Sequence, residues 1–331
     1  MPVYGMPPGS AVPPGFSPPV YRPPLPPTGG FQVMGVPPRP AARRGRVVPL
    51  LIVLVVLVTA GLLRTALVTG LHHLSSGDNV QTTYAPDTGG ENRGIAETAN
   101  NPLLTNDDYT LIPAKCDYAP WGTQVDVARK FFETAADCLH NAWKPLFDNI
   151  KLPFDPPKLK VTADTNGITT LCTGSSNNFA AFYCAADRTI YLPISQLQTD
   201  LFKNNWVVYL SVFAHEYGHH VQAEAGILGK VHQQRRDAGA RSDTGLELSR
   251  RTEQQAQCFD GMYLSSSKGG GSLTPAQITT AQNDAYHRGD GPGDMRDHGS
   301  AQHMGDWWVI GYSKDRAAQC NTFSAATADI S

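Results

Sequence analysis

The residues most able to do chemistry in this sequence are the two histidines and the glutamate of His215-Glu216-Tyr217-Gly218-His219. On a helix, residues four apart project from one face a single turn apart, so both imidazole rings can reach one zinc ion. Glu216 then lies beside the metal without binding it, where its carboxylate can take a proton from the attacking water and pass it to the leaving amine. The pattern predicts the centre of a zinc-dependent hydrolase with one catalytic Zn²⁺.

Zinc held by two histidines needs a third protein ligand and an open fourth position for water. The longer pattern HExxHxxGxxH is excluded, because Gln222 and Ala225 stand where its glycine and third histidine would be. The third ligand must therefore come from a separate helix. The best candidate is Glu253, 34 residues after the second histidine, and Glu224 and Glu247 remain alternatives.

A long helix must carry the histidine pair. Asn204 or Asn205 is expected to cap this helix, which continues through an apolar stretch to Val221. His220 points away from the face that carries the pair, so we expect it to pack or to form a hydrogen bond in the interior.

The other predicted elements give a mainly helical α+β fold with a small sheet. Glu253 falls on a helix over residues 246–263, which the Gly-rich run 268–272 should end. Apolar periodicity and alternation predict the remaining elements, which are an amphipathic scaffold helix over 125–143, a strand over 158–163 and a hairpin of 182–184 with 189–192.

The six cysteines all fall in the C-terminal two thirds of the chain, and none forms a CxxC pair. An even set with such spacing favours disulfides over a metal cluster. Nearness in sequence favours Cys116–Cys138 and Cys172–Cys184, which leaves Cys258–Cys320.

Composition divides the chain unevenly. Fourteen of the 26 prolines lie in the first 40 residues, which predicts a disordered tail over 1–46. A docking site for proline-recognising modules is a second interpretation of this tail. Residues 1–77 hold six arginines and no acid, so the remainder carries 21 basic and 29 acidic residues, and this acidic balance argues against a nucleic-acid partner.

Residues 47–71 are apolar enough and long enough to form a transmembrane helix. Arginines flank only its N-terminal side, which predicts a cytoplasmic N-terminus and an extracytoplasmic C-terminal domain in the cell membrane. A cleaved signal peptide and a buried core helix are the competing interpretations. A polar linker over 72–105 and a compact domain over 106–331 are expected to follow.

Several separated motifs resemble those of the bacterial neutral zinc metallopeptidases, in particular their membrane-anchored actinobacterial members. The resemblance covers about residues 106–323, and its motifs are His215–Gln222, the helix segment Glu253–Gly261, Phe182–Cys184 with Ile190–Leu192, His298-Gly299-Ser300 and Gln319–Phe323. It implies a zincin-like fold, zinc at His215, His219 and Glu253, and Glu216 as the catalytic base.

Two positions depart from the family pattern. Gln257 stands where the family usually has Asp, and Met304 follows His303 where the family tends to carry Gln-Arg. Gln257 can still accept a hydrogen bond from a ligand histidine, but without a formal charge it raises imidazole basicity less.

The negative charge that builds on the carbonyl oxygen during hydrolysis calls for a further hydrogen-bond donor. His298 is the candidate, because its motif matches the family and Gly299 permits a close backbone approach. Tyr217, His303 and Tyr312 have less support. A purely structural histidine that pins the C-terminal segment is the competing role for His298.

Two functions remain open at the level of sequence. The first is a membrane-anchored zinc peptidase that hydrolyses peptide bonds of a peptide or protein substrate with zinc-activated water. The second is a catalytically weak domain that acts as a cell-envelope binding or scaffold protein.

Overall fold

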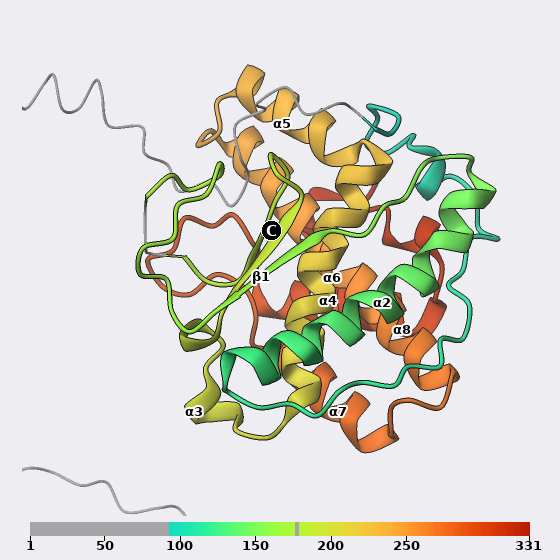
Figure 1. Ribbon diagram of the computed structural model, residues 1–331. Helices are drawn as coiled ribbons and strands as arrows, with labels where there is room; N and C mark the ends of the chain where they lie inside the picture. Colours follow the sequence, from blue (N-terminus) through green and yellow to red (C-terminus); the bar gives the residue numbers. More distant parts are fainter. Residues whose placement is uncertain (1–92, 176–178) are drawn as a thin grey trace, which may run out of the picture. The chain divides into compact units, whose positions relative to one another are not determined.

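The computed structural model describes residues 93–175 and 179–331, which belong to one compact unit of the chain (Figure 1). The predicted tail over 1–46, the predicted membrane span over 47–71 and most of the predicted linker lie outside the described residues. Within the described ranges, no helix combines the length and the apolar character needed to cross a bilayer.

The long helices expected from the sequence are present. Helix α2 spans Val125–Asn149, α4 spans Trp206–Ala225 and α6 spans Asp243–Gly269. Asn205 is the N-cap residue of α4, although its side chain makes no capping hydrogen bond, and α6 ends at Gly270 inside the predicted Gly-rich run. Four further helices were not predicted from the pattern: α3 (Thr199–Phe202), α5 (Ile227–Ala238), α7 (Pro275–Ala285) and α8 (Ala301–Lys314).

The predicted strand and hairpin form one three-stranded sheet in the order β1-β3-β2. Strand β2 (Phe182–Cys184) pairs antiparallel with β3 (Thr189–Pro193), as the hairpin pattern predicted. Strand β1 (Lys158–Thr162) pairs parallel with β3, with Leu159 opposite Ile190. Strand β2 is therefore an edge strand, and this edge packs against α4.

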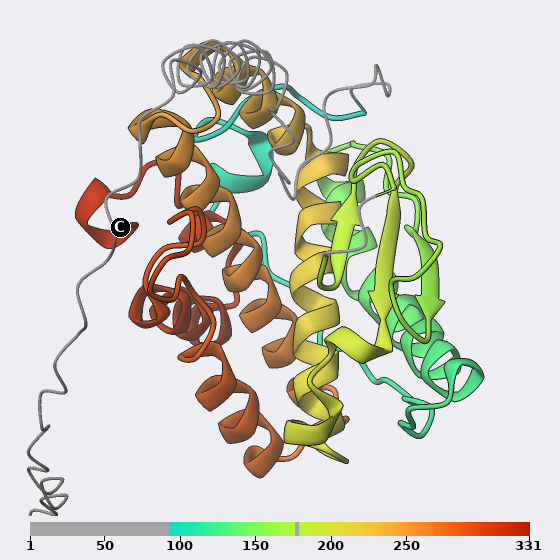
Figure 2. The same cartoon turned by 90° about the vertical axis from the view of Figure 1, so that its left-hand side faces the viewer.

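Helix α4 lies between the sheet and α6, as Figure 2 shows. Its close approach to α6 depends on Gly218, because a Cβ atom there would lie 2.9 Å from the carbonyl oxygen of Ala256. Helix α2 also packs against α6, where the rings of Trp143 on α2 and Phe259 on α6 meet edge to face at 5.1 Å. Apolar packing from three helices thus fixes the position of the two helices that carry the predicted metal ligands.

All three predicted disulfides are confirmed: Cys116–Cys138, Cys172–Cys184 and Cys258–Cys320. The third joins α6 to the short helix η3 (Ala317–Cys320). The segment that carries Glu253 is therefore covalently tied to the C-terminal part of the chain.

Packed structure begins upstream of Asn106, where the compact domain was expected to start. Leu103 and Leu104, in the short helix η1 (Pro102–Leu104), are buried in the core. Asn101 is fully buried, and its side-chain amide donates a hydrogen bond to the carbonyl oxygen of Ala225 at 2.9 Å. Two adjacent leucines are too short a run to show periodicity, which is why the sequence did not indicate this anchoring.

Candidate metal centre

Three of the predicted site residues converge on one buried point between α4 and α6. Nε2 of His215 lies 3.2 Å, and Nε2 of His219 lies 3.4 Å, from Oε2 of Glu253. Ligand atoms of all three side chains lie within 4.8 Å of one another. Two imidazole nitrogens and a carboxylate oxygen at this spacing form a donor set that suits zinc.

The other nitrogen of each histidine already has a partner. Nδ1 of His215 donates a hydrogen bond to Oε1 of Gln257 at 2.9 Å, and Nδ1 of His219 donates one to Oε1 of Gln222 at 2.9 Å. With the proton on Nδ1, each ring keeps the lone pair of Nε2 for a metal ion. The hydrogen bond expected of Gln257 is confirmed, and the residues present fit a zinc ion.

Gln222, the last residue of the motif His215–Gln222, was given no role from the sequence, but its side chain lies against His219. Its side-chain amide donates to the carbonyl oxygen of Thr252 at 2.8 Å and to Oε1 of Gln255 at 3.1 Å. Gln255 in turn donates to the carbonyl oxygen of Cys320 at 3.0 Å. The orientation of His219 is thus connected through buried amides to α6 and to the disulfide-bonded C-terminal segment. The sequence signal that could have identified Gln222 is its position three residues after His219 on the same helix.

Glu216 lies beside the metal centre and faces the cleft. Its Oε2 accepts a hydrogen bond at 2.9 Å from the backbone N–H of Tyr183 on strand β2. Burial raises the pKa of Glu216 to about 7. A carboxyl group whose pKa lies near neutrality can accept and release a proton during one reaction cycle. The hydrogen bond from Tyr183 on the sheet edge holds the Glu216 carboxylate in place for this role.

Glu253 is held as a carboxylate although it is almost fully buried. Burial opposes its ionisation, but His219 and His298, when protonated before any metal ion binds, outweigh that effect and hold the pKa of Glu253 well below its usual range. An ionised carboxylate is the form that binds a metal ion.

His298 reaches the centre from the loop that follows α7. Its Nε2 lies 3.9 Å from Oε2 of Glu253, and its side chain is 40% exposed toward the cleft. On the opposite side of the ring, Nδ1 lies 2.9 Å from Asp297 Oδ1 and 3.5 Å from Asp290 Oδ1. Burial opposes protonation, but Glu253, Asp290 and Asp297 together raise the pKa of His298 well above its usual value. The ring is therefore oriented, and held protonated, by acids on both sides.

The backbone around His298 is also fixed. Both carboxylate oxygens of Asp290 accept main-chain hydrogen bonds, from His298 N at 3.2 Å and from Gly299 N at 2.7 Å. Gly299 has φ +89°, and a Cβ atom there would lie 2.2 Å from Nε2 of Gln254. The close approach expected of this glycine is thus present. Gln254, rather than the His298 ring, contacts the C-terminal segment here, and it donates to the carbonyl oxygen of Ile330 at 2.8 Å.

The alternative third ligands, Glu224 and Glu247, lie away from the point where the histidine pair converges. Glu224 is buried beside Arg188 and Arg93, and Glu247 pairs with Arg251 at 2.7 Å, so neither faces the histidine pair. His220 packs in the interior as expected, 3.2 Å from the hydroxyl of Tyr183 and 2.7 Å from the carbonyl oxygen of Asp155.

The alternative donors are likewise engaged in other contacts. Tyr217 is fully buried against Phe213 and Phe154. His303 donates to the carbonyl oxygen of Ser331, and Tyr312 stacks on Trp308 at 5.3 Å. Of the candidates considered, His298 is the one that the structure brings beside Glu253.

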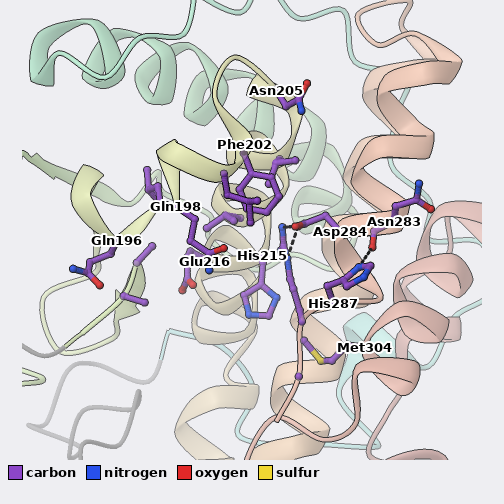
Figure 3. Close-up of a pocket in the computed structure, with 18 of the residues that line it drawn as sticks. Gln196, Gln198, Phe202, Asn205, His215, Glu216, Asn283, Asp284, His287 and Met304 are labelled. Carbon is purple, nitrogen blue, oxygen red and sulfur yellow. Dashed lines mark hydrogen bonds and ion pairs between the residues drawn. The ribbon is translucent and has the colours of Figure 1, made fainter. Parts of the chain in front are cut away.

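A cleft of about 700 Å³ opens beside the metal centre, and His215, Glu216 and His298 line it. Figure 3 shows His215 and Glu216 in the middle of this cleft, with Phe202 above them and, to one side, Asp284 at the end of α7 and His287 just after it. The cleft gives an extended ligand access to the point where Glu216 and the three converging donors meet.

A buried network supports the wall of the cleft behind His215. Oδ2 of Asp260 accepts hydrogen bonds from Ser211 Oγ at 2.6 Å and from Trp308 Nε1 at 3.0 Å. Arg288 donates to Asp284 at 2.8 Å and 2.5 Å, and its Nη1 lies 4.0 Å from Asp260 Oδ2. These contacts join α4, α6, α7 and α8 around the centre.

A mainly helical α+β fold, an HExxH segment on one buried helix and a glutamate from the next long helix are the features of a zincin-like metallopeptidase fold. The chain belongs to the family described as "Putative neutral zinc metallopeptidase", whose model matches residues 121–323.

Similar curated proteins come from several bacteria. The chain is 31% identical over 215 residues to "Uncharacterized protein YpfJ" of Escherichia coli (strain K12), covering 60% of this chain and 72% of that protein. It is also 31% identical over 214 residues to "Uncharacterized protein Mb2605" of Mycobacterium bovis and to "Uncharacterized protein Rv2575" of Mycobacterium tuberculosis, covering 56% of this chain and 67% of each relative. No solved structure was found to match the chain.

Proposed function

We propose that this protein is a zinc-dependent peptidase that hydrolyses peptide bonds. The observation that carries the proposal is the convergence of His215, His219 and Glu253 on one buried point, with Glu216 beside them in an open cleft. Family membership supports the same activity. His215, His219 and Glu253 would hold the metal.

A bound zinc ion would polarise the substrate carbonyl and make water a better nucleophile at neutral pH. Glu216 accepts the proton that this water loses and delivers it to the leaving amine. The N–H of Tyr183 keeps the Glu216 carboxylate turned toward the cleft throughout this exchange. Burial of Glu216 raises its pKa and so favours its uncharged form, which helps the carboxylate to accept this proton.

His298 is proposed to stabilise the carbonyl oxygen as it becomes negative. Asp297 and Asp290 face its Nδ1, so its Nε2 is the atom directed toward the centre. A fixed donor aimed at a developing charge lowers the barrier more than one that must first reorient.

We also propose the cellular setting that follows from the N-terminal sequence. Residues 47–71 would cross the cell membrane once, leaving the tail in the cytoplasm and residues 106–331 outside, where they would act on a peptide or protein of the cell envelope. Three disulfides in the described part of the chain suit an oxidising compartment. A proline-recognising partner of the tail belongs to the same proposal.

The second candidate, a catalytically weak binding domain, is favoured by one observation. His215 donates to the neutral amide of Gln257, where a carboxylate would raise imidazole basicity more. Activity measurements separate the two functions.

The test uses the purified protein, loaded with one equivalent of zinc, acting on casein. We expect cleavage that stops with a chelator and returns with zinc. Glu216→Gln should keep about one zinc per chain and lose nearly all activity, because Glu216 moves protons and does not bind metal. A zinc-loaded protein that cleaves no casein or peptide would support the binding role instead, and loss of zinc in Glu216→Gln would contradict the division of roles.

A further inference from the structure

One wall of the cleft is apolar and lies next to the residues proposed to carry out the chemistry. It is formed by side chains from the segment before α4 and from α4 itself, namely Leu197, Leu201, Phe202, Val208 and Val212. Leu197 and Val208 are anchored in the interior, whereas Leu201 is 67% exposed. A strongly exposed leucine at the mouth of a cleft marks a surface that can bury apolar area on binding.

The backbone that presents Leu201 is unusual. The four-residue helix α3 lies between two non-glycine residues in positive-φ conformations, Gln198 at φ 51° and Lys203 at φ 48°. Non-glycine residues adopt such angles at a cost, and these conformations persist where the surrounding structure requires them. Phe202 is held from behind by the ring of Tyr209, edge to face at 6.5 Å. The chain is thus bent so that Leu201 and Phe202 both line the cleft.

The apolar wall continues along α4 to the catalytic residues. Val208, Val212 and Glu216 follow one another at four-residue steps, so their side chains lie along one face of the helix. With a rise of about 1.5 Å per residue, Val212 lies about 6 Å along the axis from Glu216. Neighbouring Cα atoms of a peptide are about 3.8 Å apart, so a residue that flanks the scissile bond would meet this wall.

The opposite wall does not offer a free charge to a substrate side chain. Arg288 lies there, but its Nε and Nη2 donate to Asp284, which leaves the pair close to neutral. Asn283 and His287 also line this side, and Nδ1 of His287 donates to the carbonyl oxygen of Asn283 at 2.6 Å. His298 and Glu216 also line the cleft, but both are assigned to the scissile bond. Beside α3 and the start of α4, a charged side chain would lose water without an opposite charge among the described lining residues, whereas an apolar one would bury area there.

We propose that this wall is a specificity subsite for a large apolar side chain, such as leucine or phenylalanine, on one of the two residues that flank the scissile bond. The inference rests on the proposed peptidase function and names its substrate class. One additional methylene group in an apolar subsite changes kcat/KM by about 10-fold to 200-fold. The cleft therefore selects by the size and apolarity of one residue.

The first experiment measures kcat/KM of the zinc-loaded full chain on peptides that differ at one residue beside the cleaved bond. We expect leucine and phenylalanine peptides to be cleaved at least about tenfold faster than the alanine peptide, and the aspartate peptide to be slowest. Equal rates for leucine and alanine peptides, or a preference for a charged residue, would overturn the proposal.

Substitutions in the apolar wall test whether this wall causes the preference for the leucine peptide over the alanine peptide. Leu201→Asn should reduce the leucine-over-alanine preference severalfold, mainly by raising KM for the leucine peptide. Because Leu201 is exposed, the substitution should not affect folding. Leu171→Asn is the matched control, since Leu171 is 59% exposed and does not line the cleft. An unchanged preference in Leu201→Asn would place the selection elsewhere and contradict the subsite.

A binding measurement separates the subsite from catalysis. Fluorescence anisotropy of labelled leucine and alanine peptides with the Glu216→Gln protein should show tighter binding of the leucine peptide, and Leu201→Asn in that background should reduce the difference severalfold. If the wild-type chain cleaves no peptide but this difference is present, the peptidase function fails and the apolar subsite stands. If peptides are cleaved but neither binding nor kcat/KM depends on the apolar residue, the subsite fails and the peptidase function stands.

Discussion

The carboxamide oxygen of Gln222 accepts a hydrogen bond from Nδ1 of His219 at 2.9 Å, within a single helix. The same carboxamide donates across to the carbonyl oxygen of Thr252 on α6. One side chain therefore sets the tautomer of a proposed ligand and joins the two helices that must converge to form the metal centre. Its neutral character matches that of Gln257, which holds the other histidine.

Removing Gln222 should weaken zinc binding without removing a ligand. In Gln222→Leu, the Nδ1–H of His219 loses its buried acceptor. The His219 ring is then less firmly oriented, and its Nε2 is less basic. We expect zinc affinity to fall by about 10-fold to 100-fold, measured by competition with a chromogenic chelator. Gln233→Leu, at an exposed position on α5, is the control and should bind zinc normally. Wild-type affinity in Gln222→Leu would show that the hydrogen bond does not orient the ligand.

Glu253→Ala should weaken zinc binding more than any change around the ligands, by more than about 100-fold, because it removes one of three converging donors. Glu247→Ala is the matched control, since Glu247 lies on the same helix and pairs with Arg251 away from the centre. Metal content after dialysis and a competition assay give the comparison. If Glu247→Ala lost zinc while Glu253→Ala kept it, the proposed ligand set would be wrong.

His298→Ala should leave zinc content and melting temperature nearly unchanged while lowering kcat by about 10²-fold to 10³-fold, as expected for loss of a donor to the developing oxyanion. His303→Ala is the control, because the His303 ring contacts the C-terminal carbonyl of Ser331 rather than the centre. Stability that fell in proportion to activity would instead indicate a structural role for His298.

The stability of the fold should depend on pH through Asp260. Burial raises the pKa of Asp260 from 3.8 to about 7, so the folded state binds a proton that the unfolded state releases between these values. Stability is therefore highest, for this group, below about pH 4 and falls as pH rises toward 7. Asp260→Asn keeps the acceptor for Ser211 and Trp308 but cannot ionise.

Urea unfolding at pH 5 and pH 7.5 measures this effect as the difference between wild type and Asp260→Asn. We expect the wild type to lose more stability than the variant over this interval. Identical pH slopes would show that Arg288 keeps Asp260 ionised throughout. If Asp260 is ionised throughout this interval, Arg288→Met should destabilise the fold by about 3–5 kcal/mol, the usual effect of leaving a buried charge such as that of Asp260 unpaired.

The sequence by itself determined the features that depend on local periodicity. The spacing of His215 and His219 places both rings on one helical face, and the alternation in 158–163 predicts a strand there, which is present as β1. Nearness in sequence was enough for two of the disulfides. The third followed by elimination, and all three are present.

Only the tertiary structure decided which residues complete the site. Glu224, Glu247 and Glu253 are alike on a helical pattern, and what separates them is the crossing of α4 and α6 at Gly218, which brings Glu253 alone of the three to the histidine pair. The parallel pairing of β1 and the approach of His298 depend on contacts between segments far apart in the chain. Such contacts are set by the packing of side chains from several elements at once, and no single stretch of sequence contains that information.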